Sequence, residues 1–159
     1  MTIASEQTVI IALGYDALEQ VDRVMRSAFD PQYGEAWNKA QCLALMALPG
    51  YRLFGLMTPT GTMLGFSISR SVAGESELLL LAVEPAARRK SHGTMLIQNW
   101  IDDCRTDGAE RLFLEVRADN PALHFYERSG FSRLATRPDY YRGLDGVMRD
   151  AITMQFLLN

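Results

Sequence analysis

A basic turn rich in small residues, Arg88 to Gly93, is the part of the chain whose residue types and spacing best suit chemistry. An apolar run over 78–83 precedes it, and an amphipathic pattern follows it. Unpaired amides at the start of a helix, a glycine that permits close approach and neighbouring cations together form a site for phosphate or pyrophosphate. A run of charged residues is more often a solvated helix entrance than a binding site. The position of this run beside the glycine turn nevertheless favours a phosphorylated ligand.

The elements that must hold this turn can be read from periodicity, caps and turn residues. Strands are expected over 8–12, 51–58, 63–71, 78–83 and 111–117, from Phe131, and over 151–158. Helices are expected from an Asp16 cap, from an Asn38 cap to Pro49-Gly50, from Gly93 to Gly108, and from Asn120-Pro121 to Gly130. A strand, a helix and a strand over 78–117 imply a right-handed parallel connection, with the basic turn at the carboxyl edge of the sheet.

Composition indicates one domain over residues 1–159 and narrows the range of partners. The chain has 48% hydrophobic residues and a net charge of −3. These values fit a single core, and the charge argues against a general nucleic-acid binder. No segment is apolar enough for a membrane helix, and residues 1–7 lack the features of a secretory signal. A cytoplasmic location and no membrane partner are therefore expected.

The cysteines and histidines do not suggest a metal or a nucleophile. Cys42 and Cys104 sit in apolar helical patterns, where a thiol is usually a small buried hydrophobe. There are only two histidines, and no Cys-x-x-Cys spacing occurs. We predict no metal site.

Four further motifs carry a resemblance to a known family: Ala82–Ala86, Leu114–Asn120, Tyr126–Phe131 and Asp139–Tyr141. With the order of elements, they resemble the GNAT superfamily of acetyl-CoA-dependent N-acetyltransferases, and more narrowly the bacterial ribosomal-protein-alanine N-acetyltransferases. The resemblance implies an α/β (α+β) fold with a mixed, mostly antiparallel sheet of about six or seven strands and helices on both faces. The family's phosphate loop is matched over 88–93, except that Ser91 replaces the first glycine. Serine tolerates a positive φ poorly, so loop adjustment or weaker coenzyme binding would follow.

The resemblance also implies how acetyl-CoA is held. The backbone of Leu81, Ala82 and Val83 would pair with the pantetheine arm, and Asn120 would contact that arm. Amides of the turn would bind the pyrophosphate, namely those of Arg89, Lys90, Ser91, His92, Gly93 and Thr94. For Asn120 a helix cap alone is an equal alternative. His92 is interpreted as a backbone donor with a solvated ring, and not as a base.

Two residues are candidates for the chemistry of acyl transfer. The resemblance implies Glu115 as the base for the attacking amine and Tyr126 as the acid at the departing thiolate. Strand alternation places Glu115 opposite Leu114 and Val116. The structural alternatives are an ion pair of Glu115 with Arg117, and an aromatic core role for Tyr126 beside Phe125.

The acceptor is the least constrained part of the interpretation. An α-amine, with a pKa of about 7.7–8.0, is far more often neutral than a lysine at about 10.4, so one moderate base suffices. This agrees with a protein N-terminus, such as that of a ribosomal protein, as acceptor. A small amine and a catalytically silent acyl-CoA-binding module are the alternatives. The helix over 38–48 and the loop over 140–150 are expected to flank the acceptor entrance, and the sequence does not indicate an oligomeric state.

Overall fold

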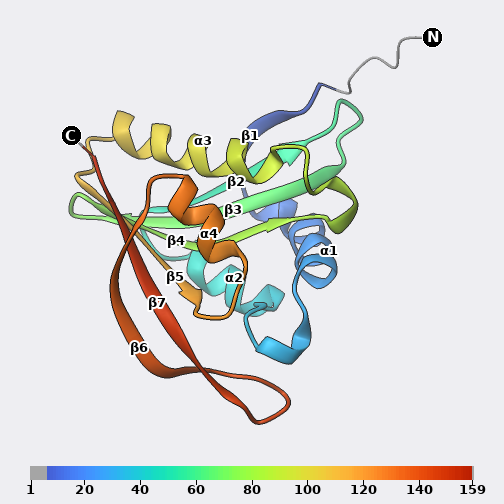
Figure 1. The fold of residues 1–159 in the computed structure, drawn as a ribbon. Coiled ribbons are helices and arrows are strands. Elements are labelled where there is room, and N and C mark those ends of the chain that lie inside the picture. The colour runs from blue at the N-terminus through green and yellow to red at the C-terminus, as the bar shows by residue number, and fades with distance from the viewer. Residues whose placement is uncertain (1–6, 159) are drawn as a thin grey trace.

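The computed structural model describes residues 7–158, in which seven strands form one sheet in the order β1-β2-β3-β4-β5-β7-β6 (Figure 1). The strands are β1 (Val9–Leu13), β2 (Tyr51–Met57), β3 (Met63–Val72), β4 (Glu75–Val83), β5 (Arg111–Arg117), β6 (Ser132–Arg142) and β7 (Met148–Leu157). Only β4 and β5 pair in parallel. The mixed, mostly antiparallel sheet is confirmed. Most of the segment in which no secretory signal is predicted, residues 1–6, lies outside the described residues.

Helices cover both faces of the sheet, as predicted (Figure 1). They are α1 (Leu18–Ala28), α2 (Lys39–Met46), α3 (His92–Thr106) and α4 (Ala122–Arg128), with short 3-10 turns η1 (Tyr15–Ala17), η2 (Pro31–Tyr33) and η3 (Pro85–Ala87). One core cluster joins α1 and α2 to β2, β3 and β4, and the other joins α3 and α4 to β4, β5 and β7. No helix among residues 7–158 is long and apolar enough to cross a membrane.

The predicted helix starts are correct at α2 and wrong at α1. Asn38 and Gln41 form a reciprocal capping box, in which each side chain accepts from the other residue's amide. Asp16 does not cap α1, because it lies within the η1 turn, and Ala17 occupies the cap position without a side-chain bond. The 3-10 turn already bonds the Ala17 amide to the Gly14 carbonyl, so the chain enters the helix without a side-chain cap.

The feature of the sheet that matters most for function is the separation of β4 from β5. Their pairing runs only from Glu75 with Arg111 to Leu78 with Leu114. The register of β4 against β3 shifts immediately afterwards, so Leu79 is an extra residue in β4. Such a bulge bends a strand and increases its twist. Both strands continue beyond this point without pairing to each other, and a cavity lies at the opening.

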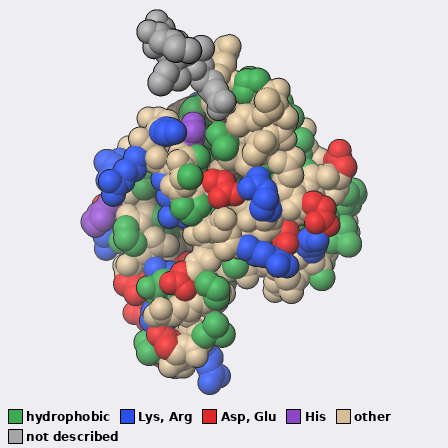
Figure 2. All heavy atoms as spheres, turned by 90° about the vertical axis from the view of Figure 1, so that its right-hand side faces the viewer, with side chains coloured by type: hydrophobic (Ala, Val, Ile, Leu, Met, Phe, Trp, Pro, Cys, Tyr) green, Lys and Arg blue, Asp and Glu red, His purple; other side chains and the backbone are tan. Residues whose placement is uncertain are grey.

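The C-terminal hairpin of β6 and β7 projects below the rest of the molecule (Figure 1, Figure 2). Apolar side chains are exposed at its tip, including Leu144 and Val147. The tip is attached to the η2 turn, because the Leu144 amide donates to the Gln32 carbonyl at 2.9 Å. A side chain at Gly143 would lie 2.4 Å from the same carbonyl oxygen, so glycine is required at this crossing.

Candidate active site

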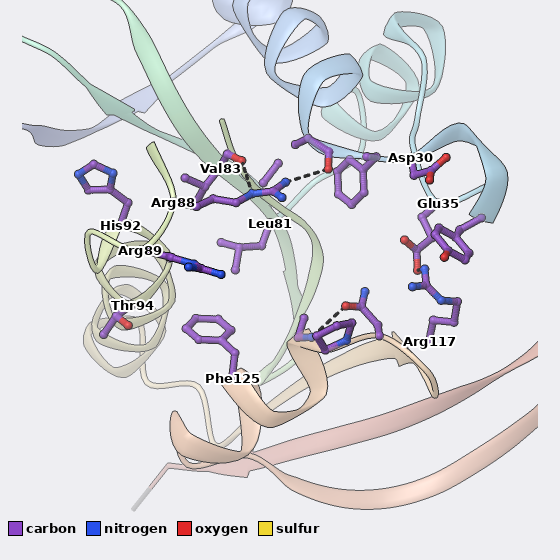
Figure 3. A pocket seen from close by; sticks show the side chains of 18 of the residues that line it. Asp30, Glu35, Leu81, Val83, Arg88, Arg89, His92, Thr94, Arg117 and Phe125 are labelled. Atoms are coloured by element: carbon purple, nitrogen blue, oxygen red, sulfur yellow. Dashed lines mark hydrogen bonds and ion pairs between the residues drawn. The ribbon is translucent and has the colours of Figure 1, made fainter. Parts of the chain in front are cut away.

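A cavity of about 740 Å³ opens between β4, the start of α3 and the start of α4. Figure 3 shows it extending from the basic turn, with Arg89 and Thr94, past Leu81 to a Glu35–Arg117 pair at the opposite end. Every residue predicted to bind the coenzyme lines it except Lys90. The sequence therefore located one end of the cavity and missed the other.

The basic turn has the backbone of a ligand-binding loop. Arg89 and Ser91 both adopt the left-handed region, with φ of 61° and 62°. This is the conformation that glycine adopts most readily, so Ser91 takes the shape expected of the family's glycine at some cost in strain. Helix α3 begins directly after Ser91, and its first amides are not used within the helix. The turn thus combines free amides, a helix N-terminus and cations.

Two side chains beside the turn have structural partners. The guanidinium of Arg88 donates to the Val83 carbonyl at 3.2 Å and to the Ala28 carbonyl at 2.9 Å, which ties β4 to the end of α1 (Figure 3). The Nδ1 atom of His92 lies 2.9 Å from the Ala87 carbonyl oxygen, to which it must donate. The ring is therefore held against η3 and is less solvated than expected.

Asn120 both accepts a hydrogen bond at the start of α4 and lines the cavity. Its Oδ1 atom accepts from the Ala122 amide at 2.9 Å, where α4 begins. The residue also lines the cavity. Because the cap uses only the oxygen, the side-chain amide group can still donate to a ligand.

Glu115 lies on the face of β5 opposite Leu114 and Val116, as predicted, but it is not among the residues that line the cavity. Its carboxylate is 3.1 Å from the Arg137 guanidinium and accepts from the Thr153 hydroxyl at 3.5 Å. The alternative of an ion pair between Glu115 and Arg117 is wrong. Arg117 instead lies over the Tyr33 ring, at 3.6 Å, and contacts Glu35 and Asp119.

Tyr126 is packed among aromatic rings at the base of α4. Its ring centroid is 5.2 Å from that of Phe125 and 6.2 Å from that of Phe131. Burial raises the pKa of the Tyr126 hydroxyl far above its usual value, and the charges of Tyr141 and Glu35 raise it further. A phenol in this environment stays protonated, so it can donate a hydrogen bond to a developing thiolate. Tyr126, like Glu115, is not among the residues that line the cavity.

An ionic cluster at the opposite end of the cavity was not anticipated. Arg117 Nη1 lies 2.7 Å from the Glu35 carboxylate, and both side chains are largely buried. Arg149 contacts Asp119 at 3.5 Å and Asp145 at 2.8 Å. Residue 35 belongs to a connection without regular structure, so no periodicity could have joined it to β5.

The connection between α1 and α2, and not α2 itself, forms this end of the cavity. Ala28, Phe29, Asp30, Tyr33 and Glu35 line it, whereas no residue of 38–48 does. The expectation that the second helix flanks the acceptor entrance therefore gains no support from this cavity. Helix α2 packs against α1, and Cys42, Leu45 and Met46 are buried there. The loop over 140–150 contacts η2 through Leu144 and Asp145.

The cavity lies where β4 separates from β5, beside the left-handed turn at the start of α3. Residues 18–131 match the Acetyltransferase (GNAT) family, and the chain belongs to this family, whose members use acetyl-CoA. Over 99 residues it is 38% identical to the [Ribosomal protein bS18]-alanine N-acetyltransferase of Escherichia coli strain K12. This match covers 62% of the chain and 66% of the length of that relative.

Solved structures agree with this family membership. The crystal structure of the ribosomal-protein-S18-alanine N-acetyltransferase from Escherichia coli superposes with a TM-score of 0.85 at 30% identity, covering 96% of this chain and 95% of that one. A phosphinothricin acetyltransferase from Sinorhizobium meliloti, in complex with AcCoA, gives a TM-score of 0.80 at 15% identity, covering 96% and 89%. The second comparison concerns the fold alone.

Proposed function

We propose that this protein transfers the acetyl group of acetyl-CoA to the free α-amino group of a protein N-terminus. The observation that carries the proposal is that one cavity joins the left-handed turn at the start of α3 to an end lined by the carboxylates of Asp30 and Glu35. The curated relatives are named for acetylation of the alanine N-terminus of ribosomal protein bS18. An acceptor of this class would place the reaction in the cytoplasm.

The residues present fit acetyl-CoA. The left-handed turn at Arg89 and Ser91 directs the amides that precede and begin α3 toward the cavity, where they would hold the pyrophosphate. Beyond Leu78 the edge of β4 that faces β5 has no partner strand, so the backbone of Leu81, Ala82 and Val83 would bond the pantetheine arm. The side-chain amide of Asn120 would complete these contacts.

The reaction needs no nucleophile from the enzyme. The neutral amine attacks the thioester carbonyl carbon, the C–S bond breaks, and the products are an amide and the thiol of coenzyme A. We assign Tyr126 as the donor to the leaving sulfur, because its hydroxyl stays protonated. We assign Glu115 as the acceptor of the amine's proton. Since Glu115 does not line the cavity, we propose that the proton reaches it through one water molecule.

Mass spectrometry of the purified protein with acetyl-CoA tests the proposal. One peptide has a free alanine N-terminus, and the other has a blocked N-terminus and an internal lysine. Acetylation of only the free terminus is expected. Acetylation of the lysine or of a polyamine instead would indicate a small-amine enzyme. Bound acetyl-CoA with no product on any amine would indicate a silent binding module.

Tyr126→Phe tests the assignment of the donor. The variant keeps the ring packing, so acetyl-CoA binding should be unchanged, while kcat falls about 10²-fold or more. Tyr51→Phe is the matched control, since Tyr51 lies on β2 and outside the cavity. Equal turnover in the two variants would remove Tyr126 from the mechanism.

A further inference from the structure

The acidic end of the cavity contains a carboxylate that has no role in the chemistry described above. Glu35 lies on the connection between η2 and α2 and lines the cavity opposite the basic turn (Figure 3). Its side chain is 14% exposed. A carboxylate is rarely buried to this degree unless a partner compensates for the lost water.

The partner that the structure provides compensates only in part. Arg117 Nη1, a buried nitrogen, is 2.7 Å from the Glu35 carboxylate. A carboxylate has two oxygens with about four lone pairs, so this contact leaves others for a second donor. Arg117 is also shared with Asp119, which takes the hydrogen bond from its Nε atom.

A second carboxylate, that of Asp30, lines the same end of the cavity as Glu35. Glu35 has Arg117 as its guanidinium partner, and Arg117 also contacts Asp119. Burial raises the pKa of Glu35 despite the neighbouring Arg117, as expected where compensation is incomplete.

Glu35 lies in the same cavity as the backbone edge proposed for the pantetheine arm, since Leu81, Ala82 and Val83 line it too. The charge of Glu35 also contributes to the raised pKa of Tyr126. Glu115 differs from Glu35, since Arg137 and Thr153 contact its carboxylate outside the cavity. An amine bound at Glu35 would therefore share the cavity with the coenzyme, and Glu115 remains available for a different role.

We propose that Glu35, held by Arg117, is the residue that binds the amino group of the acceptor. This inference rests on the proposed function and names its acceptor subsite. A carboxylate accepts a hydrogen bond from an ammonium and from a neutral amine, so the contact persists when the proton has left. The negative charge of Glu35 favours an acceptor that arrives with a free, cationic amino group over one whose N-terminus is blocked.

Glu35→Gln tests the proposal, because glutamine keeps the shape of the side chain and removes its charge. The KM for the free-amino peptide should rise about tenfold or more, as expected for the loss of one charged hydrogen bond, while the Kd for acetyl-CoA stays unchanged. Glu35→Asp should recover part of the loss. The matched control is Asp119→Asn, which removes charge from the same arginine at an exposed position outside the cavity. Its acceptor KM should stay within about threefold of the wild-type value.

The outcomes separate the two proposals. If the wild type acetylates the peptide and Glu35→Gln has the same acceptor KM, the role of Glu35 is wrong and the function stands. If the wild type acetylates only a polyamine, the proposed acceptor class is wrong, and the KM of Glu35→Gln for that amine still decides the role of Glu35. Equal increases in KM for Glu35→Gln and Asp119→Asn would indicate that the cluster only holds the fold. If the wild type acetylates no amine at all, both proposals are wrong.

Discussion

Replacing Ser91 by glycine should stabilise this protein, although glycine at a helix start usually weakens a fold. Ser91 has a φ of 62° and a ψ of 15°, and its side chain makes no capping hydrogen bond. A residue other than glycine pays about 1–2 kcal/mol for the left-handed conformation. Glycine has more conformational freedom in the unfolded chain, and this offsets about 0.5–1 kcal/mol of the stabilisation gained by removing the strain. The net gain in the free energy of unfolding should be about 0.5–1 kcal/mol.

Thermal unfolding, followed by circular dichroism, measures the effect. For a chain of this length the gain corresponds to an increase of about 1–4 °C in Tm. The matched control is Ser132→Gly, at an exposed position in β6 that does not have a positive φ. That variant should lose about 0.5–1 kcal/mol, because only the entropic cost of glycine remains.

The two variants are expected to change Tm in opposite directions. If Ser91→Gly lowers Tm as much as Ser132→Gly does, the turn is not strained at Ser91 and the reasoning is refuted. The Kd for acetyl-CoA is measured on the same samples. We expect it to be equal to or lower than that of the wild type, since glycine adopts the required backbone at no steric cost.

Three further changes test other features. Ala73→Asn should raise Tm by about 1–4 °C, because Ala73 (φ 51°) and Gly74 (φ 83°) form a hairpin turn that favours Asn-Gly; an unchanged Tm would show that Ala73 is unstrained there. Gly93→Ala should weaken acetyl-CoA binding about tenfold in a titration while Tm is preserved, since an added methyl meets only Phe125, at 3.5 Å; full affinity would argue against close approach of the ligand. Arg149 lowers the pKa of Asp145 to about 2, so its stabilisation is present above pH 3.8 and is lost as the pH falls through about 2. The Tm difference between wild type and Asp145→Asn should therefore narrow between about pH 5 and about pH 3, and a constant difference would contradict the pairing.

Local signals in the sequence predicted those parts of the molecule that local interactions determine. The Asn38 cap, the Gly130 helix end and the basic turn each depend on a few adjacent residues, and each was found where expected. Asp16 shows the limit of such signals, because a good cap residue was taken into a 3-10 turn instead. A cap preference of about 1 kcal/mol is easily overridden by the packing of the chain around it.

The acceptor end could not be predicted because it depends on contacts between distant segments. A pair of Arg117 with Glu115 on its own strand was the alternative that the sequence offered, yet Arg117 pairs with Glu35 from the other side of the cavity. The sequence does not predict the bulge at Leu79 either, because a run of four leucines does not show which one is the extra residue. Such features follow only from the assembled sheet.

Because β4 and β5 pair over a short stretch only, a bound substrate can extend the sheet along the unpaired part of β4. Four residue pairs join the two halves of the sheet, and beyond Leu78 the facing edge of β4 has amides with no partner on β5. If the pantetheine arm bonds this edge, the coenzyme becomes a structural part of the sheet as well as a reactant. Hydrogen exchange of the amides over 79–83 would then slow when acetyl-CoA binds, and the two halves would resist separation better during turnover than between turnovers.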